Sequence, residues 1–433
     1  MAQYITPASQ RRAFRLGVAN GILFGLGSAL AEPNTVLPVF VSTLTSSKAA
    51  IGLLSALAIG GWLLPQLVCA HYLQDRPHKM SLYRWTALIR CSAWLVCVPA
   101  TWWLAAPAPR LALLLFLAGY ALFTLGGGAG SIAFIDIVAK TVPVNRLGSF
   151  FGARAIGGGL LAIAAGGLVR YLLGPAGPGY PANYGLLFAL AGLMCSVALA
   201  TFAFIREPAG ASQQKQGSLL QFLLSAPSLL AADANFRRLF LTSLLVGGAW
   251  AVAPFYIIYA RDQLAMPAGM LGFYLSVQMV GSVVSNILWM PLGDRRSGKT
   301  VVQVSAAVTT LVPLLAWLIT MMGLVPGQAR LAFSAVFLLV GAGGVGGFIS
   351  STKYLIELAP EADRPRYAGA FNTFSAASAA FPVLAGALID ASSFRLAFAL
   401  AAACGLVGVL VAQRLQDLGR APGEEFLARL QAP

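Results

Sequence analysis

Six ionisable side chains stand inside long apolar runs of this sequence, where few neighbours along the chain could balance their charge. They are Glu32, Arg90, Asp136, Arg154, Lys353 and Glu357. An ionisable group at membrane depth costs about 2.5–3.5 kcal/mol on insertion scales, so such groups are functional candidates by default. Their available chemistry is proton uptake and release, ion pairing, or the binding of a charged solute.

The stretch GSALAEPNTVLPVF (27–40) places Glu32 deepest in its apolar run. Pro33 removes a backbone donor and blocks a helical hydrogen bond, so the freed carbonyl, Asn34 and the carboxylate form one polar group. Burial disfavours the charged form of a carboxyl, which would let Glu32 exchange a proton in the working pH range. We expect Glu32, with Asn34, to serve proton coupling or substrate contact; a structural carboxyl is the alternative.

The composition, 433 residues that are 58% hydrophobic and 10% charged, is far from the roughly 25% charged of soluble domains. Apolar runs of about 20 residues, each long enough to cross a bilayer, recur along the whole chain. The sequence therefore predicts an all-α polytopic membrane protein with twelve spans. Most lysines and arginines fall in alternate short loops, and this distribution predicts that both termini are cytoplasmic. The net charge of +15 therefore reflects membrane topology rather than nucleic-acid binding.

A hydrophilic interruption divides the chain into two halves of six spans. We expect an N-terminal bundle (1–205), a cytoplasmic linker with an amphipathic segment (206–236), a C-terminal bundle (237–416) and a cytoplasmic tail (417–433).

The two halves resemble each other at an offset near 217 residues. GGGAGSIAFIDIVAKTVP (126–143) aligns with GGVGGFISSTKYLIELAP (343–360), with glycines and the final proline in register. Two parallel six-helix repeats are the plan of one large class of transporters.

Two loops carry a further motif, HYLQDRPHKM (71–80) and MPLGDRRSGKT (290–300). Both resemble the signature loop of the major facilitator superfamily, which joins its helices two and three, and again eight and nine. The residues that carry the resemblance are Asp75, Arg76 and Lys79 in the first copy, and Asp294, Arg295 and Lys299 in the second. The first copy has histidines where the motif has glycines. The resemblance implies the twelve-helix facilitator fold and a gating role for these loops. The alternative is that the loops are solvated and only set the orientation of the chain in the membrane.

Asp136 and Lys353 occupy equivalent positions of the repeat, yet they carry opposite charges. One interpretation is a salt bridge between them that closes the cytoplasmic face when the other face is open. A second is that Lys353 binds an anionic substrate. A third is that Asp136 pairs locally with Lys140, one helical turn away.

Arg90 and Arg154 lie about 10–12 Å inside the cytoplasmic boundary, at 1.5 Å per residue. Their long stems could reach the membrane surface, or their charge could contact substrate. Tyr256, beside the kink expected at Pro254, is either an aromatic packing residue or part of a substrate wall.

No nucleophile motif, zinc cluster, nucleotide-phosphate loop or cofactor fingerprint is found in the sequence, which therefore predicts neither an enzyme nor a metal or cofactor site. We expect a secondary active transporter in a bacterial inner membrane. It would be a monomer that moves a small organic or amphipathic solute by alternating access, coupled to protons, with export favoured. The alternatives are uptake of an organic anion and a facilitator-like sensor or assembly factor that does not transport.

Overall fold

The computed structural model describes residues 7–73, 76–210, 227–360 and 364–418. The part it describes is built from helices and contains no strand. Twelve helical segments in it are long and apolar enough to cross a membrane. Asp75, most of the linker expected at 206–236 and most of the tail expected at 417–433 lie outside the described residues.

The first half holds six spans. Their helices are α1 (Pro7–Leu30), α2 (Val36–Leu44), α3 (Lys48–Leu73), α4 (Met80–Pro99, continued by a π-helical turn over Ala100–Leu104), α5 (Pro109–Thr141), α6 (Leu147–Leu173) and α7 (Ala182–Ala203). The first span is broken, since α1 and α2 are separated by residues 31–35.

The second half repeats this plan. Its helices are α9 (Ala234–Trp250), α10 (Ala253–Gln263), α11 (Met270–Arg295), α12 (Gly298–Met321), α13 (Pro326–Leu358), α14 (Arg364–Ser375), α15 (Phe381–Ala391) and α16 (Phe394–Gln413). The seventh span is broken between α9 and α10. The eleventh changes to a 3₁₀ turn at Ala376–Ala380, between α14 and α15.

These helices are apolar on most of their circumference, as expected when one side faces lipid and the other faces a packed interior. Large side chains remain exposed along the outer faces, for example Leu288 at 70% and Leu331 at 71%. The interior is aromatic, with Phe40, Phe116 and Phe188 in mutual contact. The chain is an integral, multi-pass membrane protein.

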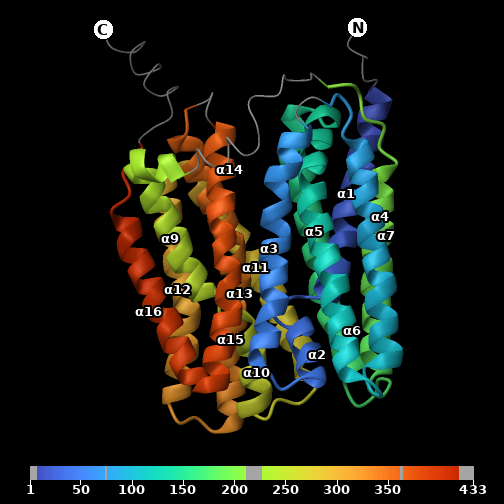
Figure 1. The fold of residues 1–433 in the computed structure, drawn as a ribbon, viewed down its shortest axis with the longest axis vertical. Coiled ribbons are helices and arrows are strands. Elements are labelled where there is room, and N and C mark those ends of the chain that lie inside the picture. The colour runs from blue at the N-terminus through green and yellow to red at the C-terminus, as the bar shows by residue number, and fades with distance from the viewer. Residues whose placement is uncertain (1–6, 74–75, 211–226, 361–363, 419–433) are drawn as a thin grey trace.

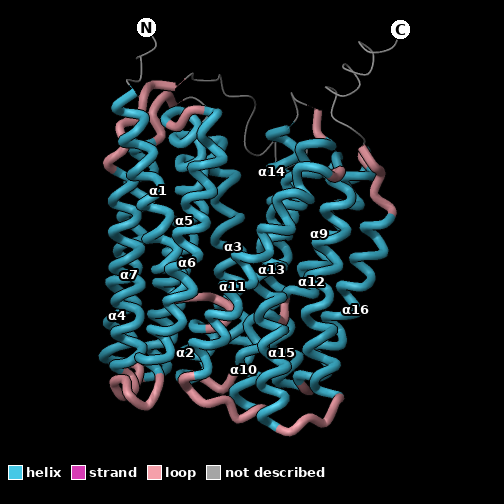
Figure 2. The backbone as a smooth tube through the Cα atoms, turned by 180° about the vertical axis from the view of Figure 1, so that it is seen from behind, coloured by secondary structure: helices cyan, strands magenta, loops and turns pink. Residues whose placement is uncertain are grey.

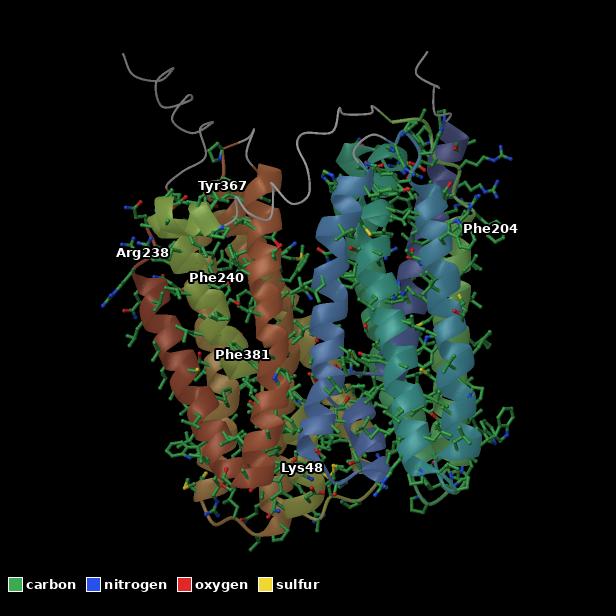
Figure 3. All side chains as sticks on the ribbon, in the orientation of Figure 1. Lys48, Phe204, Arg238, Phe240, Tyr367 and Phe381 are labelled. Atoms are coloured by element: carbon green, nitrogen blue, oxygen red, sulfur yellow. The ribbon has the colours of Figure 1, made fainter. Side chains whose placement is uncertain are left out.

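Helices α1–α7 form one bundle and α9–α16 form the other (Figures 1 and 2). The bundles meet at the end far from the two chain termini and diverge toward the end that carries them. Figure 3 shows Lys48 near the closed end, and Arg238 and Tyr367 near the end that carries the termini. We call these the closed end and the terminal end.

The bundles touch along two seams near the closed end, α3 against α15 and α6 against α11. Glycines allow backbone to approach backbone there. A Cβ atom at Gly272 would overlap the Gly166 carbonyl, and one at Gly52 would overlap the Pro382 carbonyl. The two seams are equivalent under the internal repeat.

The repeat is visible in the helices themselves. α5 and α13 are each 33 residues long and begin with a proline in the first turn. The fold is thus an all-α membrane protein of two pseudo-symmetric six-helix bundles, as the sequence predicts.

Candidate functional site

The break in the first span is organised by Glu32, whose side chain is only 7% exposed. Its carboxylate accepts hydrogen bonds from the backbone N–H of Asn34 at 2.7 Å, the Asn34 amide at 3.0 Å and the Thr35 hydroxyl at 2.9 Å. Pro33 supplies no N–H and weakens the helix at this point; helices α3 and α12 continue through Pro65 and Pro313, so the proline alone does not account for the break. The residues that interrupt the helix therefore also solvate the carboxylate.

Glu32 also faces the other bundle. The side chain of Gln278, on α11, is close enough to the carboxylate to interact with it electrostatically. The Oε1 atom of Gln278 is buried without a partner, so that amide has unused acceptor capacity next to a carboxyl group. Among the described residues, no cation forms an ion pair with Glu32. The first break thus holds a buried carboxyl whose partners are all neutral, at the contact between bundles.

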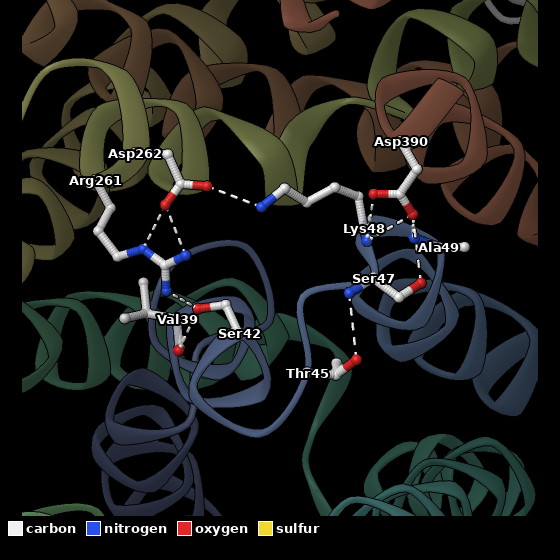
Figure 4. Close-up of polar contacts among 9 residues, drawn as sticks. All are labelled: Val39, Ser42, Thr45, Ser47, Lys48, Ala49, Arg261, Asp262 and Asp390. Carbon is white, nitrogen blue, oxygen red and sulfur yellow. Dashed lines mark hydrogen bonds and ion pairs between the residues drawn. The ribbon is translucent and has the colours of Figure 1, made fainter. Parts of the chain in front are cut away.

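A polar network seals the closed end across the bundles (Figure 4). Lys48 Nζ lies 2.8 Å from Asp262 Oδ2. Arg261 lies 2.6 Å from the same carboxylate and also donates to the Ser42 hydroxyl. The network joins α2 and the start of α3 to the end of α10.

Asp390 adds a second connection at this end. Its carboxylate accepts from the backbone N–H of Lys48 at 2.9 Å and of Ala49 at 3.2 Å, and from the Ser47 hydroxyl at 3.3 Å. These N–H groups begin α3 and have no partner within the helix, so Asp390, on α15, caps a helix of the opposite bundle.

The sequence analysis missed this network. Lys48 and Arg261 look in the sequence like ordinary loop residues that set topology. The contacts that cross between the bundles, Lys48 to Asp262 and Arg261 to Ser42, join residues more than two hundred positions apart. The available signal was the presence of the acids Asp262 and Asp390 at span ends on the side with few charges.

At the terminal end of the first bundle, Asp136 pairs with two lysines. Its Oδ1 lies 2.7 Å from Lys79 Nζ, and its Oδ2 lies 2.5 Å from Lys140 Nζ. Lys140 also lies 2.8 Å from Glu207, which accepts from the backbone N–H groups of Lys79 and Met80 at the start of α4.

The second bundle has a smaller version of this cluster. Lys353 Nζ lies 3.1 Å from Glu357 Oε1, and Glu357 accepts from the N–H of Gly298 at the start of α12, at 2.8 Å. In this conformation Asp136 and Lys353 are therefore each paired within their own bundle. The bridge between the two remains a prediction for a state in which the terminal end is closed.

Two half-buried arginines of the first bundle, Arg90 and Arg154, lie against aromatic rings. Arg154 donates to the Gly17 carbonyl and, at 2.9 Å, to Asn20 Oδ1, and it lies over Phe134 and Phe150. It is therefore turned toward α1.

Arg90 lies 4.9 Å from the ring centre of Phe24 and 4.5 Å from that of Phe123, and its Nε has no partner. Within the described residues, neither Arg90 nor Arg154 has a carboxylate partner.

The other predicted residues are placed as follows. Arg76 contacts the Tyr72 hydroxyl and ring. Asp294 and Arg295 are exposed, and with Lys299 they form no ion pair in the described part of the chain. Tyr256 is 1% exposed and packs against Phe333 and Phe398, so it belongs to the aromatic interior of the second bundle.

Solved structures with this fold are transporters. The chain matches a D-xylose–proton symporter with a TM-score of 0.68 at 13% identity, covering 94% of this chain and 98% of that one. It matches a POT family transporter bound to 5-aminolevulinic acid with a TM-score of 0.65 at 12% identity, covering 94% and 95%. A bacterial homologue of the iron transporter ferroportin gives 0.60 at 15%, covering 93% and 98%.

The sequence of the second half supplies the decisive match. Residues 238–429 fit the family model of the Major Facilitator Superfamily. The match covers the second bundle and the described start of the tail, and the fold neighbours show the same architecture for the first bundle. No curated protein matches the chain. The similarities found are to the major facilitator superfamily and to transporters.

Proposed function

We propose that this facilitator is a proton-coupled secondary transporter of a small organic solute, and that Glu32 is the group that carries the proton. The observation that supports this most directly is the buried Glu32 carboxyl with neutral partners only. A carboxyl paired with a lysine stays ionised, whereas burial without a counter-charge favours the protonated form, against the hydrogen bonds that Asn34 and Thr35 donate to the carboxylate.

The position of Glu32 links its protonation to the movement of the bundles. Gln278 belongs to the opposite bundle and has a free acceptor atom. A protonated Glu32 can donate to that atom, and an ionised Glu32 cannot. A proton on Glu32 would therefore stabilise the contact between α1–α2 and α11, and its release would weaken it.

The distribution of basic loops and the shape of the molecule support an inward opening. By the positive-inside rule the terminal end is cytoplasmic, so the described conformation has its inward face open and its outward face sealed by the Lys48–Asp262 and Asp390 contacts. Opening the outer seal would give Glu32 access to protons outside. One fold neighbour is named a proton symporter, which is compatible with this scheme.

The test is solute-driven proton movement in liposomes that contain the purified chain and a trapped pH-sensitive dye. A panel of sugars, polyols, organic acids, amines and amphipathic drugs would be imposed as gradients from either side. We expect at least one solute to move protons, with the sign of the pH change giving symport or antiport, and so uptake or export. Glu32→Gln should retain solute exchange and lose the proton movement.

The matched control is Glu32→Asp, which keeps a titratable carboxyl in the break and should retain part of the coupling. A panel in which no solute moves protons, or in which Glu32→Gln behaves as the wild type, contradicts the proposal. If the chain exchanges none of the solutes, the result favours the role of a sensor or assembly factor.

An organic anion is the second candidate solute. It is favoured by the two half-buried arginines, because Arg90 and Arg154 have no carboxylate partner in the described residues and Arg90 Nε is unused. If an organic acid is the active member of the panel, Arg90→Gln should raise the concentration needed for half-maximal flux.

A further inference from the structure

A groove with basic walls lies at the terminal end of the first bundle, where the start of α1, the start of α4 and the residues after α7 come together. It consists of two adjoining pockets of about 240 and 490 Å³, and Arg12, Ile205 and Arg206 line both. Arg84 and Phe204 also line the larger pocket. The volume of that pocket falls within the range of sites for small molecules, about 300–1,000 Å³. We call this feature the basic groove.

Three arginines bring positive charge to the basic groove without a counter-charge. Arg12, Arg84 and Arg206 are exposed, and none of them forms an ion pair within the part of the chain that the structure describes. Among the described residues that line the groove, one carries a carboxylate, Glu207. Its side chain is nearly buried and is bound to Lys140 and to the N–H groups at the start of α4. The groove therefore has a net positive charge.

The three guanidinium groups have unused hydrogen-bond donors. Arg84 donates to the Ala203 carbonyl through Nη2 at 3.1 Å and Nε at 3.3 Å, which fixes its side chain between α4 and α7. Three of its five N–H donors remain. Arg12 and Arg206 donate to no acceptor within the described residues. Guanidinium groups with free donors match the oxygens of a phosphate, which they can bind through two parallel hydrogen bonds.

The surface next to the basic groove is apolar. Phe204 and Trp85 are each 67% exposed, and Leu88, one helical turn after Arg84, is 61% exposed. Figure 3 shows Phe204 on the outer edge of the first bundle, on the side away from the second bundle. That face of a membrane-spanning bundle contacts lipid. The position therefore suits a molecule with an anionic head and an apolar tail.

The second bundle differs at the equivalent position. Met80 begins α4 and Gly298 begins α12, and each donates its N–H to a glutamate, so the two helix starts correspond. Arg84 is the fifth residue of α4, whereas the fifth residue of α12 is Val302, which is 4% exposed. A positive charge that only sets orientation needs no place within a helix. The position of Arg84 is therefore a specific feature of the first bundle.

We propose that the basic groove binds the headgroup of an anionic phospholipid, with Arg12, Arg84 and Arg206 around the phosphate and with Phe204 and Leu88 against the acyl chains. The inference is independent of the proposed transport function. Anionic lipids give the cytoplasmic leaflet its negative surface potential, and the positive-inside rule places the terminal end in that leaflet. A bound lipid would join the ends of α1, α4 and α7.

The test is native mass spectrometry of the purified full chain titrated with phosphatidylglycerol. Phosphatidylethanolamine with the same acyl chains is the counterpart without net charge. We expect the first phosphatidylglycerol to bind more tightly than phosphatidylethanolamine. A basic residue near an anionic lipid contributes about fivefold in affinity, so the triple variant Arg12→Gln/Arg84→Gln/Arg206→Gln should weaken binding of that first lipid at least about tenfold.

The matched control removes the same number of charges from the terminal end of the second bundle. Arg237→Gln/Arg296→Gln/Arg414→Gln replaces three exposed arginines there and should retain tight binding. Equal weakening by the control would show that the lipid is drawn only by the overall charge, and would overturn the site.

A double variant covers the case in which Arg84→Gln disturbs the contact between α4 and α7. Arg12→Gln/Arg206→Gln leaves the bond from Arg84 to Ala203 in place and should still weaken the binding of phosphatidylglycerol, with an unchanged unfolding temperature. The assignment is also overturned if both variants bind as the wild type does, or if phosphatidylethanolamine binds as tightly as phosphatidylglycerol. Glycerol 3-phosphate has the phosphate without acyl chains. If it displaces the lipid at equal concentration, the groove takes a soluble phosphate and the lipid assignment is wrong.

Discussion

The two bundles are built on one plan but differ in their buried polar groups. The first contains the carboxyl of Glu32 and the guanidinium groups of Arg90 and Arg154. The second has hydroxyl and amide groups at the corresponding depth, with Thr242 and Gln278 among the most buried. Among the buried polar side chains of the described residues, Glu32 is the one that can ionise. The difference therefore makes the proposed proton coupling a property of one repeat, which substitutions in that repeat can test separately.

The strongest test of this comparison removes the charge from the break in the first span. That break then becomes as neutral as the break in the seventh span. Glu32→Gln should reduce proton-driven solute flux about 10- to 100-fold, the range of a typical coupling free energy. Exchange of solute across the membrane without a gradient should persist, because the substitution removes the titratable group and keeps a side chain of the same size. The measurement is flux in liposomes with and without an imposed pH gradient, and equal losses in both assays would contradict the division of roles.

A second prediction concerns the order of charges at the terminal end. The first bundle has Asp136 followed by Lys140, and the second has Lys353 followed by Glu357. Exchanging Asp136 and Lys140 would place like charges opposite each other when the terminal end closes. We expect this double variant to lose about tenfold in exchange rate, as for a coupling near 1.4 kcal/mol.

Exchanging Lys353 and Glu357 as well should restore the rate, because opposite charges would again face each other. Absence of rescue, in a protein with an unchanged unfolding temperature, would instead favour local pairing or substrate contact for these residues.

The smallest effect is expected at the seam between α3 and α15. Asp390→Ala removes the cap from the first turn of α3, at a cost of about 0.5–2 kcal/mol. The population with the outer face open should rise several-fold. Distances between spin labels on the outer ends of α3 and α15 would report this change.

Asp390→Asn keeps an acceptor for the α3 N–H groups and is the matched control. It should shift the population less than Asp390→Ala does. Equal shifts would show that the charge of Asp390, rather than its capping bonds, holds the seam.

The sequence predicts the fold closely because membrane spans are marked by long apolar runs. The repeat offset found in the sequence is the offset between α5 and α13, and the polar stretch around Glu32 is where the first span breaks. These features are local in the chain, so they can be read without knowledge of tertiary contacts.

The parts of the site that depend on contacts between distant residues were not predicted. Asp390 and Lys48 are separated by most of the chain, and nothing in either local sequence indicates a cap across bundles. The unpartnered hydroxyls of the second bundle were missed for a related reason. A serine or threonine on a helix usually donates to a carbonyl of the preceding turn, and only the packed structure shows that Thr242 and Ser375 do not.

The glycines of the two seams have a practical consequence. Because Gly166 and Gly272 bring two backbones together, the added methyl group of Gly272→Ala acts as a wedge between the bundles. Gly52→Ala acts in the same way on the equivalent seam, against Pro382. Such a substitution needs no ligand and no change of charge, so it should favour the form in which the closed end has opened and allow that form to be studied structurally.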